Sequence, residues 1–492
     1  MVKFSDEDVS LERVVITSVQ DSEKFAQVVA NSLGKPTILK KIMHPRVYTA
    51  REFGPKFQVD IAGKHVYIIA PNDPWEMGPQ GKSWRVGMVA QAANDNNVGE
   101  VTAVLPDCNF TRKERHERGT GRSLRFMANV FKVAGIDRVL TVHAHTSRAI
   151  NIFGEVYFEQ EAKKKANELL LEYPMVADIL ERHIGNRALV DFLDLTRPGK
   201  RKKDEKTGDW EYEKDEIFDF NNKTLMEKVN SFFESYDAHT YELGKTVFYD
   251  LDMAPLVAHY LVTESMLADR IDFASGGKNL VLFYSDLGAR PFGERIRHYL
   301  GLLGLPNVGY LQILKLRKAP NDPNKIIAEI DLEQSDFGGS LENKYLFGAD
   351  DGTDSGGTFD MAAKAVKAEE FVEKFGLPVD VALYFTQAWM SGRNYKDPQD
   401  LLAGINPIEI ITTNTNTNIE RHLIPAFEGR TTTLRLARYI AAAIKYGFEG
   451  GRDLEDVFAF KTKDDLMVRA GLIYSIKRSR ELHPRELVDI LI

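Results

Sequence analysis

The stretch Tyr345-Leu-Phe-Gly-Ala-Asp-Asp-Gly-Thr-Asp-Ser-Gly-Gly-Thr358 predicts a strand, a tight loop and the start of a helix. Its apolar run, Tyr345–Ala349, stops at two aspartates, and small polar residues then lead into the helix-permissive segment Phe359–Glu370. Glycines let a backbone approach a phosphate closely, and the first amides of a helix point towards an anion. The stretch therefore predicts an anion-binding loop at the end of a strand in an α/β fold.

This loop offers groups for both ends of a ribose 5-phosphate. The acidic pair before it suits a ribose diol, or a Mg²⁺ ion carried by the same ligand. The glycines, hydroxyls and helix amides after it suit the phosphate. The residues expected to contact the ribose phosphate are Asp350, Asp351, Asp354, Ser355, Gly356, Gly357 and Thr358. The alternative is an ordinary acidic turn that caps a helix, because Asp, Ser and Gly favour turns for local reasons.

Composition describes an ordinary globular chain. Its 492 residues suffice for two or three domains, and 43% of them are hydrophobic and 28% charged. The net charge of −8 argues against nucleic-acid binding. The single cysteine, Cys108, excludes an intrachain disulfide and fits a reducing compartment. With no signal-like start and no membrane-length apolar run, we expect a cytoplasmic protein with neither membrane nor nucleic-acid partners.

Apolar runs alternate with helical patterns on both sides of a charged segment. Strands are expected at residues 14–17, 64–70, 101–105, 139–143, 280–284, 345–349, 379–385 and 408–413. Helices are expected at 22–33, 84–93, 123–134, 292–303 and 432–446. This alternation is typical of parallel sheets flanked by helices. Between the two halves the sequence has a helical pattern and many charged residues, and an exposed loop is expected at Pro198–Gly208.

These patterns divide the chain into four expected segments. They are an N-terminal α/β domain (1–153), a helical charged insertion (154–246), a second α/β domain (247–458) whose residues 250–262 pack with the N-terminal half, and a helical extension (459–492).

Four further motifs precede the anion loop. They are Phe110-Thr-Arg-Lys-Glu-Arg-His-Glu-Arg118, Leu140-Thr-Val-His-Ala-His-Thr146, Tyr284-Ser-Asp-Leu-Gly-Ala-Arg-Pro291 and Ile313-Leu-Lys-Leu-Arg317. In this order the set resembles the ribose-phosphate diphosphokinases, the phosphoribosyl-diphosphate (PRPP) synthetases, from about Val14 to Phe458. The resemblance implies two type I phosphoribosyltransferase-like domains, interrupted by the mainly helical insertion.

The same resemblance implies an activity and a set of roles. The β,γ-diphosphate of ATP would pass to the anomeric hydroxyl of ribose 5-phosphate, giving PRPP and AMP, with Mg²⁺ and in a homo-oligomer, a dimer or hexamer. Lys315 and Arg317 match the catalytic basic pair that stands before a mobile loop. The implied ATP-binding residues are Tyr48, Glu52, Arg112, Lys113 and His145. The implied metal ligands are His145, Asp286 and His143.

Several positions depart from the family's pattern. Lys113 stands at a glutamine position and His143 at an aspartate position. Ala50 and Arg51 interrupt the adenine-pocket segment, and Gln387 replaces a histidine. These departures leave the nucleotide and metal preferences open.

Three other functions stay open from the sequence. The insertion is compatible with a larger acceptor, such as ADP-ribose, in the same diphosphate transfer. The anion loop alone is also compatible with phosphoribosyl transfer to a base. A non-catalytic, synthetase-associated regulatory protein is the third, although the retained Lys315 and Arg317 argue against it.

Overall fold

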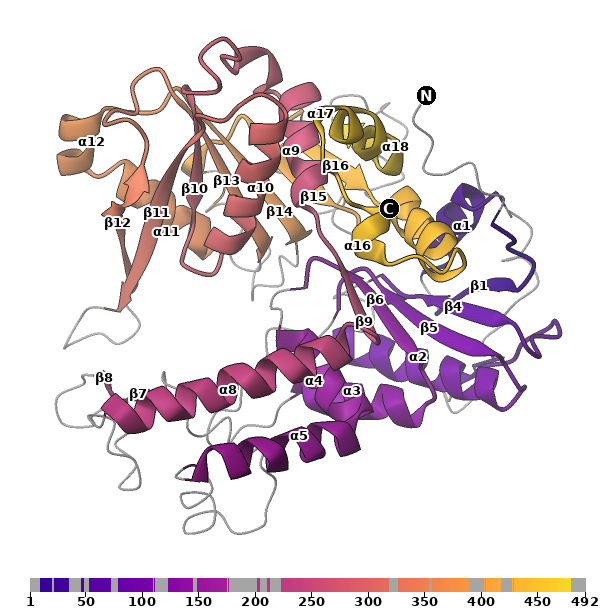
Figure 1. The fold of residues 1–492 in the computed structure, drawn as a ribbon. Helices are drawn as coiled ribbons and strands as arrows, with labels where there is room; N and C mark the ends of the chain where they lie inside the picture. Colours follow the sequence, from indigo (N-terminus) through magenta and orange to yellow (C-terminus); the bar gives the residue numbers. More distant parts are fainter. Residues whose placement is uncertain are drawn as a thin grey trace.

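The computed structural model shows two α/β lobes that each contain a β-sheet (Figure 1). It describes residues 9–19, 22–34, 46–47, 53–71, 78–108, 110, 123–144, 148–174, 176, 201–203, 210–212, 223–317, 326–353, 356–388, 402, 404–416, 427 and 429–478. The predicted fold class is confirmed: both sheets are mainly parallel and flanked by helices. Within these residues, no helix has the length and apolarity needed to cross a membrane.

The first sheet has five parallel strands in the order β1-β4-β5-β6-β9. Their bounds are Val14–Ser18, His65–Ile69, Glu100–Leu105, Arg138–Val142 and Phe248–Leu251. The helices between them are α1 (Glu23–Ser32), α2 (Gly78–Asn94), α3 (Ser123–Val133) and α4 (Arg148–Tyr157). A small antiparallel pair, β2 (Arg46–Val47) and β3 (Phe53–Gly54), lies between β1 and β4 in the chain. The apolar runs that predicted the four earlier strands are buried in the sheet, as parallel strands require.

The second sheet has eight strands in the order β12-β11-β10-β13-β14-β15-β16-β17. Their bounds, from β10 to β17, are Leu280–Tyr284, Gly309–Arg317, Ile326–Asp336, Tyr345–Thr353, Asp380–Ala388, Glu409–Thr413, Thr431–Arg435 and Ser475–Arg478. The edge strands β12 and β17 are antiparallel to their neighbours, and the other pairs are parallel. Its helices include α10 (Arg290–Leu302), α11 (Gly357–Val366) and α12 (Glu369–Phe375).

One hydrophobic core lies between the two sheets and joins the lobes. Alternate strand residues enter it from both sides, such as Ile16 and Tyr67 from the first sheet and Leu282 and Tyr384 from the second. The helices between the sheets include α9 (Ala254–Thr263) and α15 (Ala437–Ala442), and α1 packs directly on α15. The outer faces have separate cores, under α2 to α4 in the first lobe and under α11 in the second. The first sheet is therefore covered on one face partly by C-terminal helices.

A polar contact at the end of the helix pair α15–η4 (η4 is the π-helix Ala443–Phe448) reinforces this arrangement. The hydroxyl of Tyr67, on β4, donates to Glu449 Oε1 at 2.6 Å, and His65 Nδ1 lies 3.0 Å from the same oxygen. The ring of Phe448 stacks near Tyr67, with 6.3 Å between the ring centroids. The C-terminal segment is thus tied to the first sheet by both apolar and charged groups.

The insertion extends from the outer helices of the first lobe (Figure 1). It contains α5 (Glu159–Glu172) and the long α8 (Lys223–Gly244), which share a small core of their own. Helix α8 lies so close to α4 that a Cβ atom on Gly154 would be 2.0 Å from the carbonyl oxygen of Thr240. The loop expected at residues 198–208 instead contains a strand, β7 (Arg201–Lys203), which pairs with β8 (Trp210–Tyr212). Strand β9 then returns the chain to the first sheet beside β6.

Two C-terminal expectations need correction. The helix expected at 432–446 begins only at Ala437, because Thr431–Arg435 forms β16; three successive β-branched threonines favour a strand. The extension expected to be helical contains short helical turns and then β17, which closes the sheet against β16. The remaining helical pieces are η3 (Ala268–Arg270), α16 (Leu454–Val457), α17 (Lys463–Asp465), η5 (Leu466–Ala470) and α18 (Gly471–Ile473).

His259 should make the stability of this C-terminal packing depend on pH. Its Nδ1 lies 2.8 Å from the Tyr474 hydroxyl and its Nε2 lies 3.3 Å from the carbonyl oxygen of Met467. Burial lowers the pKa of His259 below its usual 6.5, so the unfolded chain binds a proton more readily than the folded one. We expect the free energy of unfolding to fall as the pH drops below about 6.5, more steeply than in His259→Gln. Urea denaturation of both proteins across this range checks it, and parallel slopes would contradict it.

Candidate active site

Charged residues from three strands meet at one edge of the second sheet. Asp286 follows β10, Lys315 and Arg317 end β11, and the pair Asp350-Asp351 lies near the end of β13. Strand β10 lies between β11 and β13, and all three run in the same direction. In open parallel sheets, ligands bind at this carboxyl edge of the strands. The order of the strands therefore brings to one edge of the sheet the backbone positions of residues that are up to 65 positions apart in the sequence.

Asp350 is the buried centre of an acidic corner. Its Oδ2 accepts a hydrogen bond from Ser285 Oγ at 2.7 Å, and its Oδ1 accepts one from the backbone amide of Asp351 at 2.9 Å. The pKa of Asp350 lies well above its ordinary value, first because the group is buried and then because the Asp351 and Asp286 carboxylates are near. The corner therefore concentrates negative charge that a cation or a hydroxyl-rich ligand would relieve.

Asp286 is held in place by the turn that leads into α10. Its Oδ1 accepts a hydrogen bond from the backbone amide of Ala289 at 3.1 Å. Aspartate commonly closes a turn in this way, through a backbone amide a few residues ahead. The carboxylate consequently stays at the strand end, close enough to Asp350 to raise its pKa.

The anion loop leads into α11 through a left-handed glycine. Gly356 has φ of +75° and stands immediately before the helix, which begins at Gly357. A residue with a Cβ adopts this conformation only at a cost, so the glycine is needed for the turn. Thr358 lies in the first turn of the helix. Asp354 and Ser355 lie outside the described residues.

Lys315 and Arg317 are placed by the hairpin of β11 and β12. Their backbones pair with those of Ala328 and Ile326, respectively. Residues two apart on a strand share one face of the sheet, so the two positions belong to the same face. The segment expected to form the closing loop, residues 318–325, lies outside the described part of the chain.

In the first lobe, His143 lies at the end of β6 and reaches the second lobe. Its Nδ1 is 2.6 Å from Thr386 Oγ1, and its ring centroid is 4.0 Å from that of Phe292. The side chain is buried, and its role as a metal ligand stays a prediction. Within the described residues, no three His, Cys, Asp or Glu side chains gather as a metal-binding group. The other predicted nucleotide and metal residues, Tyr48, Glu52, Arg112, Lys113 and His145, lie outside those residues.

Three polar residues that the sequence analysis did not place in the site support it. Ser285 binds Asp350, Thr386 binds His143, and Asp250 Oδ1 accepts a hydrogen bond from the Ala144 amide at 2.9 Å. Each lies at or just beyond the carboxyl end of a predicted strand or of β9. This position at a strand end was the one feature of the sequence that could have marked them as site residues. Their partners could not be read from it, because each bond joins residues that are distant in the sequence.

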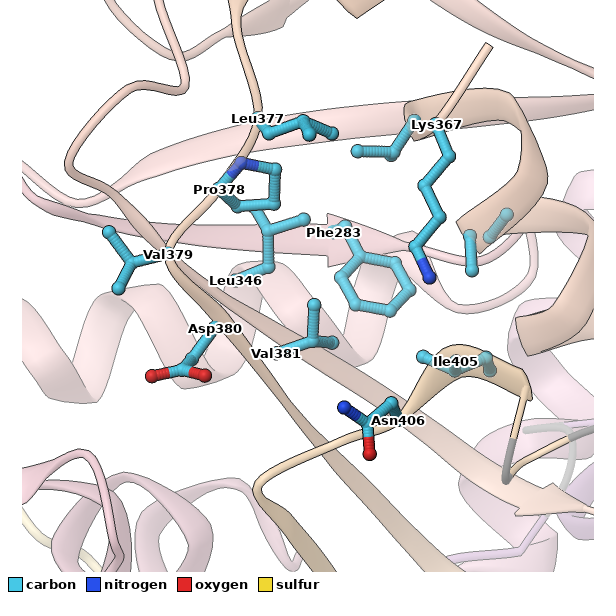
Figure 2. A pocket seen from close by; sticks show the side chains of 13 residues that line it. Phe283, Leu346, Lys367, Leu377, Pro378, Val379, Asp380, Val381, Ile405 and Asn406 are labelled. Carbon is cyan, nitrogen blue, oxygen red and sulfur yellow. The ribbon is translucent and has the colours of Figure 1, made fainter.

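A hollow of about 220 Å³ lies at the opposite end of the second sheet (Figure 2). Leu346 and Val381, near the starts of β13 and β14, line it together with Phe283 and Ile405. The lining is mostly apolar, and Lys367 has an exposed side chain that donates to the carbonyl oxygen of Gly404 at 3.4 Å. The hollow therefore lacks the grouped charges of the carboxyl edge.

Comparison with known proteins agrees with this geometry. The family profile of the N-terminal domain of ribose phosphate pyrophosphokinase matches residues 14–135. This range carries three strands of the first sheet, β1, β4 and β5. The first lobe is therefore similar in sequence to the N-terminal domain of ribose phosphate pyrophosphokinases. A ribose-phosphate pyrophosphokinase of Ralstonia nicotianae is 25% identical over 207 residues, which cover 38% of this chain and 62% of the relative. Ribose-phosphate pyrophosphokinase 1 of Streptococcus pyogenes is 24% identical over 164 residues, or 33% of this chain and 45% of the relative.

A solved structure extends the likeness to both lobes. Phosphoribosylpyrophosphate synthetase from Mycobacterium smegmatis superposes with a TM-score of 0.54 at 16% sequence identity, covering 89% of this chain and all of the other. At that identity the match establishes a shared fold. By sequence, the chain aligns with less than two thirds of the length of either curated relative named above. The likeness thus rests on sequence in the first lobe and on fold alone in the second.

Proposed function

We propose that this protein transfers the β,γ-diphosphate of ATP to the anomeric hydroxyl of ribose 5-phosphate, giving PRPP and AMP. The observation that carries the proposal is the carboxyl edge of the second sheet. There, an acidic pair near the end of β13 leads towards the glycine turn before α11, and a basic pair ends β11, with β10 between the two strands. A ribose 5-phosphate needs both a diol partner and a phosphate partner, and this edge offers both.

Each group at the edge has a chemical task in the proposal. Gly356, Gly357 and the first amides of α11 would bind the 5-phosphate, as helix N-termini bind anions. Asp350 and Asp351 would accept hydrogen bonds from the ribose hydroxyls. Lys315 and Arg317 would stabilise the negative charge on the diphosphate as it moves. Asp354, Ser355 and Thr358 would complete the phosphate contacts.

The nucleotide half and the metal are also part of the proposal. Tyr48, Glu52, Arg112, Lys113 and His145 would bind ATP. For Mg²⁺, the carboxylates of Asp286 and the acidic corner supply the oxygen ligands that this ion prefers. His143 fits less well, because its ring is buried and its Nδ1 is engaged by Thr386. When bound, Mg²⁺ would neutralise charge on the phosphates and orient them.

The insertion favours a second candidate acceptor, a ribose 5-phosphate carried within a larger molecule such as ADP-ribose. The chain leaves the first sheet after β6, at the end that carries His143, and returns at β9 through α8. This detour places extra surface on the lobe proposed to bind the nucleotide.

We also propose that the protein forms a homo-oligomer, because the resemblance to the ribose-phosphate diphosphokinases implies one.

Release of AMP from ATP and Mg²⁺, followed by chromatography, tests these readings. We expect AMP when ribose 5-phosphate is the acceptor. AMP with ADP-ribose alone would replace the proposed acceptor with the larger one. No AMP with either acceptor, from a folded protein, would contradict the enzymatic proposal and favour a regulatory one. Release of pyrophosphate from PRPP, with transfer of the phosphoribosyl group to a base, would instead indicate a phosphoribosyltransferase.

A further inference from the structure

The end of strand β6 carries a backbone turn that is costly for its residue. His143 has φ of +51°, in the left-handed region that residues with a Cβ rarely adopt. Such conformations are strained and persist only when surrounding contacts hold them. They cluster at functional sites, and this one stands between β6 and the predicted metal-binding position His145.

Two contacts from the same lobe hold one side of the turn. The amide of His143 donates to the carbonyl oxygen of Leu251 at 3.1 Å. The next amide, that of Ala144, donates to Asp250 Oδ1 at 2.9 Å. Both acceptors lie on β9, the strand to which the chain returns after the insertion. The amides of the turn are therefore fixed by the first lobe.

The carbonyls of the turn are fixed by the second lobe. Gln387 Nε2 lies 3.2 Å from the carbonyl oxygen of Val142 and 3.3 Å from that of His143, and donates to both. The Gln387 side chain is buried, with 1% of its surface exposed. Its Oε1 accepts no hydrogen bond within the described part of the chain, so the amide is oriented by its NH₂ group. The neighbouring Thr386 engages the His143 ring, which adds a second contact between the lobes.

Gln387 also stands beside the anion loop. It lies near the end of β14 and pairs with Gly352 on β13. Gly352 lies in the sequence between the acidic pair and Gly356. One residue therefore has its backbone in the strand pair that carries the ribose-phosphate loop and its side chain on the turn of the other lobe.

We propose that Gln387 is a positioning residue. It fixes the end of β6, in the lobe proposed to bind ATP, relative to the loop proposed to bind ribose 5-phosphate. This inference rests on the proposed function. The amide NH₂ supplies its two hydrogens to the two carbonyls of the turn. When that link is lost, the His143 turn relaxes while the anion loop stays intact. A shift of about 1 Å between reacting groups is enough to slow a reaction by up to roughly 10²-fold.

The test uses Gln387→Met, which keeps the size of the side chain and removes both donors. We expect kcat for AMP release to fall about tenfold or more, with the KM for ribose 5-phosphate changed less than about threefold. Gln387→His, which keeps one N–H donor, should recover most of the activity. The matched control is Asn151→Leu, which removes another buried amide donor, one that bridges α4 to the Asp237 carbonyl at 2.7 Å. It should lower stability without this loss of kcat.

A second measurement does not depend on catalysis. Hydrogen exchange at the amides of residues 142–144 should speed up about tenfold in Gln387→Met relative to Asn151→Leu, because the turn opens more often. Unchanged exchange, or a kcat equal to that of the control, would overturn the inference. A wild-type protein that releases no AMP would instead contradict the proposed function, and the exchange rates would still decide whether Gln387 holds the turn.

Discussion

Replacing Lys315 with alanine is expected to lower the rate of AMP release by roughly 10²–10³-fold. The charge of the transferred diphosphate is spread over its oxygens in the transition state, so a positioned cation contributes more there than in the bound substrates. The loss should therefore appear mainly in kcat. Steady-state kinetics with ATP and ribose 5-phosphate, at saturating Mg²⁺, measure it directly.

Lys367→Ala is the matched control for this substitution. Lys367 is exposed beside the apolar hollow (Figure 2). The hollow lies at the opposite end of the sheet from the acidic corner. Removing its charge should change the rate by less than about twofold, because water and salt screen a distant surface charge. Equal kinetics for the two alanine variants would remove Lys315 from the proposed catalytic pair.

Gly154→Ala is expected to destabilise the protein by about 3 kcal/mol or more. The new methyl group would meet backbone, not a flexible side chain: the Thr240 carbonyl oxygen at 2.0 Å and the Gly244 amide nitrogen at 2.8 Å. Helices α4 and α8 would have to separate, and α4 covers the outer core of the first sheet. Urea denaturation followed by circular dichroism gives the change in the free energy of unfolding.

Gly301 provides the opposite case for the same chemical change. It lies in α10, and a Cβ placed there would have no atom within 4 Å. Gly301→Ala should raise stability by about 0.5–1 kcal/mol, because alanine loses less backbone entropy in a helix. If Gly154→Ala proved as stable as the wild type, the close contact between α4 and α8 would be wrong.

The sequence sufficed to locate most of the parallel strands, although not β9, β11 or β16, and the acidic corner. Strand β10 was expected at residues 280–284 and occupies Leu280–Tyr284, because an entirely apolar run bounded by polar residues suits a buried strand. The edge shared by Asp286 and Asp350 then follows from topology, since parallel strands place their carboxyl ends together. Local pattern and general sheet geometry are enough for this part of the site.

Contacts between distant segments were beyond reach of the same reasoning. Gln387 and the Val142 carbonyl are 245 positions apart, and no periodicity in either segment encodes their distance. Strand β17 was missed for a related reason: Ser475–Arg478 is short and gains its hydrogen bonds only from β16. Tertiary pairing, and not local preference, decides such elements.

The core between the sheets has a consequence for how the polypeptide matures after synthesis. A ribosome delivers strands β1 to β6 long before α15, yet α15 packs on α1 and helps to cover the inner face of that first sheet. Until α15 has been synthesised, the nascent chain carries a half-covered sheet, a surface that holdase chaperones recognise. A premature stop codon upstream of residue 437 would accordingly expose the beginning of the protein as well as shorten its end.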